Sequence, residues 1–156
     1  MKNILFGCTA NICRSPFADR ALRIPLIEKR VAKVEVHSAG VNALPGLSPP
    51  SEAIQIAGDF SVDVSEHISR PFSIDMIRKA DIILVMDLYH IEKILEMEPE
   101  AEDKTKLLGN YSTFRRNTPE EMEIPDPYGL TLFHYRLSFN IILDCINNLY
   151  KELFET

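Results

Sequence analysis

The chain has 156 residues, a length that suits one domain with a single core, and its formal net charge at pH 7 is -6. Hydrophobic residues make up 46% of it, yet no apolar run approaches the roughly 20 residues that a membrane helix needs. No basic stripe is evident and the apolar start is too short for a signal peptide, so we expect a cytoplasmic protein with no nucleic-acid binding and no membrane insertion.

Strands and helices are predicted to alternate along the first half of the chain. An apolar run predicts a strand at residues 2–7, and Ser15 is expected to cap a helix that ends near Arg23, just before a proline. An alternating pattern predicts a second strand at residues 33–38. After a loop rich in glycine and proline, a short helix is expected at residues 51–57, with its first serine as the cap.

The second half of the chain continues this alternation. A helix is predicted from Ser73, and the β-branched run at residues 81–86 is typical of a strand buried on both faces. A helix is expected at residues 88–97 and a short fourth strand at residues 104–109. A long helix is predicted over residues 130–154. Its apolar stripe consists of Phe133, Leu137, Ile141, Ile142, Cys145, Leu149 and Leu153.

Strands that alternate with helices indicate βαβ units and a parallel sheet covered on both faces. We therefore expect a single three-layer α/β/α domain over residues 1–156, with a central four-stranded parallel sheet. Ligands bind at the carboxyl ends of the strands in such sheets. Cys8 follows the first predicted strand, so it lies at such an end.

The segment between the first strand and the first helix has the composition of an anion site. Cys8 and Arg14 flank a short loop, in which backbone N–H groups and the helix dipole can surround an anion. The Arg14 guanidinium would add a planar fork of donors, and the same donors favour a thiolate at Cys8, the form that attacks phosphorus. Asp126, between two prolines, could protonate the leaving oxygen. On spacing alone, an inert cysteine and a surface arginine remain equally open.

Four segments in this order resemble the low-molecular-weight protein tyrosine phosphatase family: "CTANICRSP" near the N-terminus, "SAG" at residues 38–40, "MD" at 86–87 and "IPDPYG" near the C-terminus. The segment "SAGVNALPG" resembles bacterial members associated with exopolysaccharide and capsule tyrosine kinases. The resemblance implies a phosphate-binding loop after the first strand and a phosphotyrosine protein as substrate, with a bacterial tyrosine autokinase as one candidate. It implies phosphate as product and no cofactor, and no cluster has metal-ligand spacing.

The resemblance also implies a role for individual residues. Cys8 would be the nucleophile that forms a phosphocysteine, Arg14 would bind the phosphoryl oxygens, and Asp126 would be the general acid. Ser38 and His67 would support the loop, and Cys13 would trap oxidised Cys8 as a reversible disulfide. The expected substrate-binding residues are Thr9, Ala10, Asn11, Ile12, Cys13, Ser15, Leu44 and Tyr128.

Two positions leave alternatives open. Ala10 stands where the family usually has glycine, so we expect strain or a narrower cradle there, and a non-catalytic phosphate-binding module is an alternative. The arginine-phosphatase branch resembles "CTGNTCRSP", with threonine where this chain has Ile12. The isoleucine favours phosphotyrosine over phosphoarginine as the substrate, and a protein arginine phosphatase is an alternative.

A third alternative is a thiol-dependent arsenate reductase. Arsenate reductases share the fold but need a further thiol relay. The chain lacks a cysteine near residues 80–90, and Cys145 is expected to be a buried structural residue.

Overall fold

The computed structural model describes residues 2–114 and 117–155. Its strands are β1 (Lys2–Cys8), β2 (Val34–Gly40), β3 (Ile82–Val85) and β4 (Thr105–Leu107). They form one sheet in the order β2-β1-β3-β4, in which every neighbouring pair is parallel. The predicted four-stranded parallel sheet is therefore confirmed.

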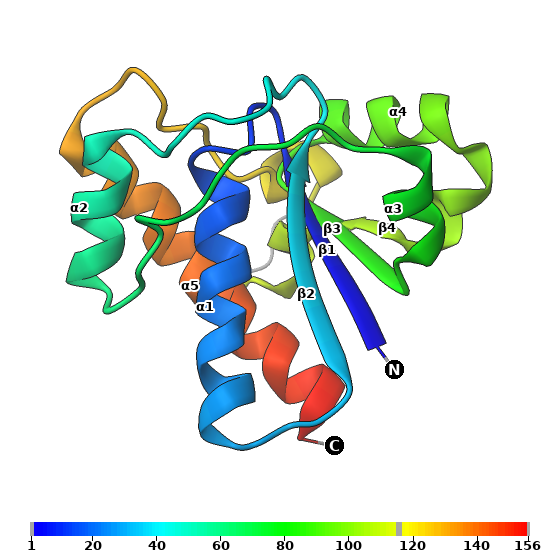
Figure 1. Cartoon of the computed structure of the whole chain (residues 1–156), viewed down its shortest axis with the longest axis horizontal. Coiled ribbons are helices and arrows are strands. Elements are labelled where there is room, and N and C mark those ends of the chain that lie inside the picture. The colour runs from blue at the N-terminus through cyan, green and yellow to red at the C-terminus, as the bar shows by residue number, and fades with distance from the viewer. Residues whose placement is uncertain (1, 115–116, 156) are drawn as a thin grey trace.

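Helices cover both faces of this sheet. They are α1 (Arg14–Glu28), α2 (Ser51–Asp59), α3 (Ile74–Lys79), α4 (Leu88–Met97) and α5 (Leu132–Phe154). Figure 1 shows α1, α2 and α5 on one side of the strands and α3 and α4 on the other, which gives the predicted three layers. No helix in the described part of the chain is long and apolar enough to cross a membrane.

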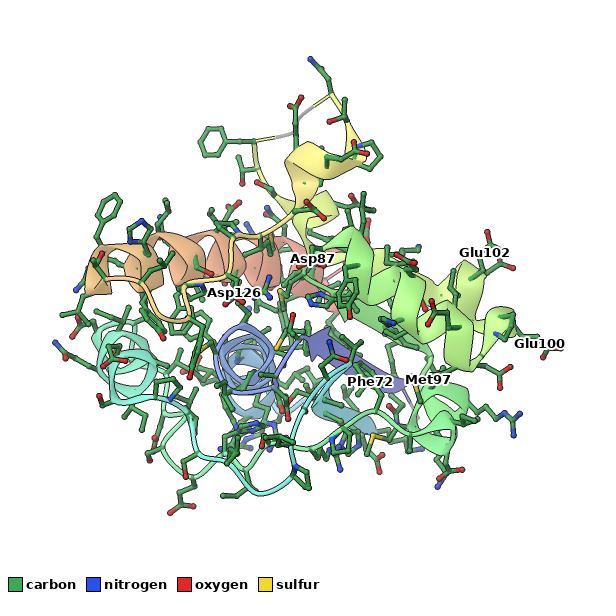
Figure 2. The ribbon with its side chains drawn as sticks, turned by 90° about the horizontal axis from the view of Figure 1, so that it is seen from above. Phe72, Asp87, Met97, Glu100, Glu102 and Asp126 are labelled. Carbon is green, nitrogen blue, oxygen red and sulfur yellow. The ribbon has the colours of Figure 1, made fainter. Side chains whose placement is uncertain are left out.

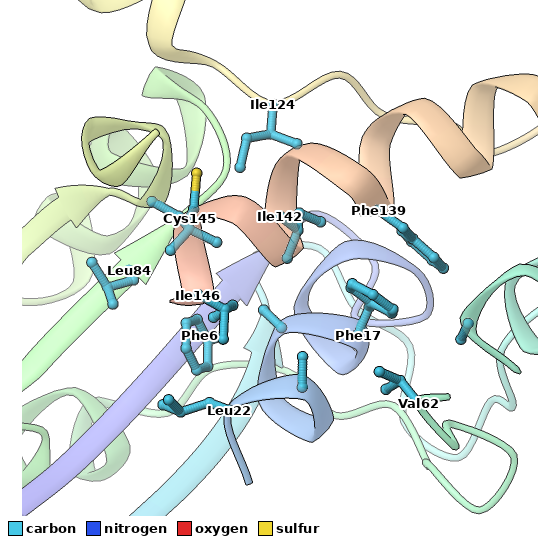
Figure 3. Close-up of a cluster of buried hydrophobic side chains, with 14 of the residues drawn as sticks. Phe6, Phe17, Leu22, Val62, Leu84, Ile124, Phe139, Ile142, Cys145 and Ile146 are labelled. Atoms are coloured by element: carbon cyan, nitrogen blue, oxygen red, sulfur yellow. The ribbon is translucent and has the colours of Figure 1, made fainter. Parts of the chain in front are cut away.

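The central strand β1 is buried on both faces, as its apolar sequence predicts. Successive side chains of a strand point to opposite faces, so Phe6 belongs to the larger apolar cluster and Leu5 to the smaller one beneath α3 and α4. Figure 3 shows the larger cluster between the sheet, α1 and α5, where the Phe17 and Phe139 rings stack with centroids 4.2 Å apart. This packing fixes the start of α1 directly above the end of β1.

Helix α1 differs from its prediction at both ends. The N-cap is Cys13 and not Ser15, whose hydroxyl bonds other side chains instead. The helix also continues through Pro25 to Glu28 rather than ending near Arg23. Leu26 beyond the proline is buried in the core, and its burial explains why the last turn forms although Pro25 has no N–H to donate.

Other element ends also differ from the sequence-based expectation. Strand β2 extends to Gly40, whereas the fourth strand is short and gives way to a 3-10 turn at Leu108–Tyr111. Two further 3-10 turns span Pro99–Lys104 and Pro119–Met122. Pro50, not Ser51, is the N-cap of α2.

The apolar stripe predicted for the last helix is wrong in its first turns. Phe133 and Leu137 are 68% and 44% exposed. The buried positions at this end of α5 are instead Tyr135, Ser138 and Phe139, because the face that packs on α1 and α2 carries these residues.

Candidate active site

The loop between β1 and α1 lies at the carboxyl edge of the sheet and opens into a cavity of about 280 Å³. Its lining residues are Cys8, Thr9, Ala10, Ile12, Cys13, Arg14, Asn42, Leu44, Leu47, Asp126 and Tyr128. Nine of these are residues that the sequence predicts, and Asn42 and Leu47 are additional. Asn11 and Ser15, also predicted to bind substrate, are fully buried beneath the loop.

Asn11 holds the loop in its curled form. Its φ of 58° lies in the left-handed region, which asparagine tolerates better than most residues. Its amide nitrogen donates to the hydroxyls of Ser15 (2.8 Å) and Ser38 (3.0 Å). Its amide oxygen accepts the backbone N–H of Arg70 at 3.0 Å. The side chain therefore ties the loop to α1, β2 and the segment that follows His67.

His67 supports the same residue from the other side. Its Nε2 donates to the Asn11 carbonyl oxygen at 2.8 Å, and its side chain is buried. Burial lowers the pKa of His67, so the imidazole stays neutral at neutral pH. Ser38 and His67 thus both contact Asn11.

The Cys8 side chain is almost fully buried at the base of the cavity. Its sulfur lies 2.9 Å from the Ser15 hydroxyl oxygen. Because this oxygen already accepts a hydrogen bond from Asn11, the Ser15 hydroxyl is free to donate its own hydrogen to the sulfur. The Ser15 hydroxyl is therefore a hydrogen-bond donor directed at the Cys8 sulfur.

Arg14 begins α1 and is 2% exposed. Its Nη1 donates to the Ile124 carbonyl oxygen at 2.8 Å and lies 3.5 Å from Asp87 Oδ2. Its Nη2 lies 3.6 Å from Asp126 Oδ2. The guanidinium is thus oriented by three segments far apart in sequence and faces the same cavity as Cys8.

Asp126 lies at the mouth of the cavity, with its side chain half exposed. Its Oδ1 accepts the backbone N–H of Tyr128 at 3.1 Å, which leaves Oδ2 directed towards Arg14. Figure 2 looks down on this end of the molecule and labels Asp126, on the loop before α5, and Asp87, at the start of α4. The two carboxylates approach the Arg14 guanidinium from different elements.

Exposed apolar side chains form the rim of the cavity. Leu44 and Tyr128 are 67% and 60% exposed, and Ile12 and Leu47 also line the opening. The loop that carries Leu44 is fastened by Ser69, whose hydroxyl donates to the Leu44 carbonyl oxygen at 2.5 Å and accepts the Leu47 N–H at 2.9 Å. Ser69 has no sequence signal of its own, because its partners are more than twenty residues away.

Cys13 differs from Cys8 in its surroundings. Burial raises the pKa of the Cys13 thiol to about 12, although the Tyr135 hydroxyl lies 3.8 Å from its sulfur and acts in the opposite direction. Cys13 is therefore a protonated thiol at neutral pH. Burial likewise raises the pKa of Cys145, in the middle of α5, to about 12.

The strain expected at Ala10 is not found in its backbone. Among the residues that the structure describes, positive φ within the loop falls on Asn11 and not on Ala10. The glycine that the loop requires is Gly40, at the end of β2 beside Cys8. A Cβ there would lie 2.6 Å from the Thr9 carbonyl oxygen and 2.9 Å from the Asn11 nitrogen.

Residues 2–114 and 117–155 contain no group of three or more His, Cys, Asp or Glu side chains that could hold a metal ion. The cavity lining includes a thiol, a guanidinium and a carboxylate from Cys8, Arg14 and Asp126. The thiol and the guanidinium suit an anionic, phosphoryl-like ligand.

Comparisons with known proteins agree with this chemistry. The model of the low molecular weight phosphotyrosine protein phosphatase family matches residues 3–156. The low molecular weight protein-tyrosine-phosphatase Wzb of Escherichia coli K12 is 38% identical over 126 residues, covering 81% of this chain and 78% of Wzb.

Solved structures of a tyrosine phosphatase and of an arginine phosphatase share the fold of this chain. The crystal structure of the Erwinia amylovora tyrosine phosphatase AmsI superposes with a TM-score of 0.86 at 29% identity, covering 98% of this chain and 93% of AmsI. The YwlE arginine phosphatase of Geobacillus stearothermophilus gives a TM-score of 0.84 at 31% identity, with 98% and 93% coverage. The chain therefore belongs to the low molecular weight phosphotyrosine protein phosphatase family.

Proposed function

We propose that this chain hydrolyses phosphotyrosine in proteins through a phosphocysteine on Cys8. The observation that carries the proposal is that Cys8, Arg14 and Asp126 line one small cavity next to the N-terminus of α1. The Cys8 thiolate attacks phosphorus, and the bond to the tyrosine oxygen breaks as Asp126 donates its proton to that oxygen. Water then attacks the phosphocysteine, Asp126 takes a proton from it, and phosphate and the Cys8 thiolate are released.

In this proposal Arg14 and the loop N–H groups bind the phosphoryl oxygens. The Arg14 guanidinium is held in place before substrate arrives, by Ile124 and by the carboxylates of Asp87 and Asp126. Donors that are already oriented stabilise the charge of the transition state without reorganising. Ser15, through its 2.9 Å contact with the sulfur, assists Cys8 both as nucleophile and as leaving group.

The substrate class follows from the cavity walls. Ile12, Leu44, Leu47 and Tyr128 present apolar surface to whatever carries the phosphoryl group, which suits an aromatic ring. A phosphoarginine side chain would place a polar guanidinium against the same surface. Asp126 is the one carboxylate among the described lining residues, and in this mechanism it acts on the leaving group.

Location and partner are further parts of the proposal. A thiolate nucleophile needs a reducing compartment, which favours the cytoplasm. The segment "SAGVNALPG" resembles bacterial members associated with polysaccharide synthesis, so a bacterial tyrosine kinase or a polysaccharide-export protein is the proposed substrate. Thiol-dependent arsenate reduction is not supported, because Cys145 is fully buried within α5.

The test compares a phosphotyrosine peptide, a phosphoarginine peptide and para-nitrophenyl phosphate. Cys8→Ser should abolish turnover of all aryl phosphates. The same variant should still bind inorganic phosphate, as measured by calorimetry. Cys145→Ala, which removes a thiol outside the cavity, should retain turnover. A Cys8→Ser variant with full turnover, or a preference for phosphoarginine in the wild type, would overturn the proposal.

A second variant tests the general acid. Asp126→Asn should lower kcat for the phosphotyrosine peptide by about 100-fold or more. The loss should be smaller for para-nitrophenyl phosphate, whose more acidic leaving group needs less protonation. Equal losses on the two substrates would contradict the role given to Asp126.

A further inference from the structure

His90, in the first turn of α4, is a fully buried histidine next to the active-site loop. Its Nδ1 accepts the backbone N–H groups of Met86 (3.3 Å) and Asp87 (3.2 Å). A backbone nitrogen can only donate, so Nδ1 must be the acceptor and the ring hydrogen lies on Nε2. The nearby Asp87 carboxylate, at 3.4 Å from Nδ1, does not reverse this assignment, because the two N–H donors are closer.

The other ring nitrogen reaches the active-site loop. His90 Nε2 lies 2.8 Å from the hydroxyl oxygen of Thr9, which therefore accepts the hydrogen bond. Thr9 directly follows Cys8 and lines the cavity. Its own carbonyl oxygen accepts the Asn42 N–H at 2.9 Å. Thr9 is thus held from α4 on one side and from the loop after β2 on the other.

The same turn of α4 also reaches the far end of the loop. Asp87 caps α4 by accepting the His90 N–H at 3.3 Å, and its Oδ2 lies 3.5 Å from Arg14 Nη1. Figure 2 labels Asp87 at the start of this helix. The first turn of α4 therefore contacts both Thr9, beside the cysteine, and Arg14, six residues after the cysteine.

We propose that His90 is a positioning residue of the phosphatase: its Nε2–H fixes Thr9, and through Thr9 the Cys8 sulfur, relative to the Arg14 guanidinium. His90 does not touch substrate and acts only through Thr9. Threonine is stiff about χ1, so fixing its hydroxyl also restrains the backbone that carries it. The proposal rests on the phosphatase function proposed above.

A histidine that served only the stability of α4 would give a different pattern of effects. Two variants separate the hydrogen bonds that Nδ1 accepts from the hydrogen bond that Nε2 donates. In His90→Asn, the side-chain oxygen can replace Nδ1 as acceptor for Met86 and Asp87, but the side chain is too short for Thr9. In His90→Gln, the amide nitrogen can replace Nε2 as donor to Thr9, but the acceptor at the Nδ1 position is lost.

The measurements are kcat and KM with para-nitrophenyl phosphate, the affinity for inorganic phosphate, and the midpoint of thermal unfolding. His90→Asn should keep a nearly normal midpoint and lose about 10- to 100-fold in kcat. His90→Gln should unfold earlier yet recover most of the lost kcat. His37→Asn, at a half-exposed site on β2 outside the active site, is the control that should change neither kcat nor the midpoint of thermal unfolding. An unchanged kcat in His90→Asn, or a kcat loss that follows the midpoint across both variants, would overturn the proposal.

A double-mutant cycle tests whether the effect passes through Thr9. Thr9→Val removes the hydroxyl but keeps the branched shape, so it should lose kcat to the same extent as His90→Asn. The double variant should lose no more than either single variant, because both remove the same hydrogen bond. If the fold-losses in kcat of the two single variants multiply in the double variant, His90 does not act through Thr9.

Two readouts need no turnover. Nitrogen NMR of the imidazole should show the Nε2–H tautomer in the wild type, and the Nδ1–H tautomer would refute the assignment. Phosphate affinity should weaken in His90→Asn and not in His37→Asn. The two proposals can fail separately. If the wild type has the Nε2–H tautomer and His90→Asn weakens phosphate binding, but the wild type hydrolyses no aryl phosphate, the proposed function is refuted and the positioning of the loop by His90 is supported.

Discussion

Asn11 is the residue whose replacement tests the construction of the loop most directly. Asn11→Ala removes three side-chain hydrogen bonds of 3.0 Å or less, to Ser15, Ser38 and Arg70. At about 1 kcal/mol each, they sum to about 3 kcal/mol. The φ of 58° adds about 1 kcal/mol for an alanine in the left-handed region. We expect a loss of about 4 kcal/mol in the free energy of unfolding.

Asn11→Gly separates the two contributions. Glycine also loses the hydrogen bonds but adopts positive φ without a steric penalty, so it should be more stable than the alanine variant by about 1 kcal/mol. Asn140→Ala, at an exposed position on α5, is the matched control and should cost almost nothing.

Urea unfolding at neutral pH measures all three variants. Because the lost contacts include the one that leaves the Ser15 hydroxyl free for Cys8, kcat should also fall by about tenfold or more in both Asn11 variants. An alanine variant that loses less than about 1 kcal/mol, or one as stable as the glycine variant, would refute the reasoning.

Two further predictions concern oxidation and acid. Peroxide should inactivate the enzyme and thiols should restore it, because Cys8 and Cys13 line the same cavity. The Cys13 thiol can lose its proton and attack the Cys8 sulfenic acid, forming a disulfide with loss of water. Cys13→Ser should recover less activity than the wild type, and equal recovery would rule out the trap. Burial lowers the pKa of His90 from 6.5 to about 4, opposed by Asp87 and Asp126 and aided by Arg14, so between these values the unfolded chain binds a proton that the folded chain does not. Stability should therefore fall as the pH drops from 6.5 towards 4, by on the order of 3 kcal/mol, and His90 should contribute no pH dependence above about pH 7.5. Urea unfolding of the wild type and His90→Asn across this range tests it, and parallel curves would contradict it.

The part of the site that is local in sequence could be predicted. The apolar run of β1, the loop and the start of α1 follow one another within the first sixteen residues, and local patterns locate Cys8 and Arg14 there. The cap of α1 was predicted wrongly for a physical reason. Serine is a good N-cap, but the Ser15 hydroxyl accepts a hydrogen bond from Asn11 and contacts the Cys8 sulfur. The helix therefore begins without a side-chain cap.

The contacts that orient the site could not be predicted from local patterns. Asp87 lies 73 positions from Arg14, and His90 lies 81 positions from Thr9. Only the pairing of β1 with β3, which brings the start of α4 to the loop, creates these contacts. Nothing in the sequence around His90 therefore indicates that its ring reaches Thr9.

Ala10 shows why a motif has to be considered together with its neighbours. A glycine is expected at this position for its freedom at positive φ, yet the left-handed residue of the loop is Asn11. Asn11 is stabilised there by its own side-chain hydrogen bonds, and the close approach that excludes a Cβ occurs at Gly40 on the next strand. Alanine at position 10 therefore needs no unusual backbone, and its methyl group adds only to the lining of the cavity. The spacing of the cysteine and the arginine identifies the loop, but its shape depends on residues of β2 and α4 that the spacing does not include.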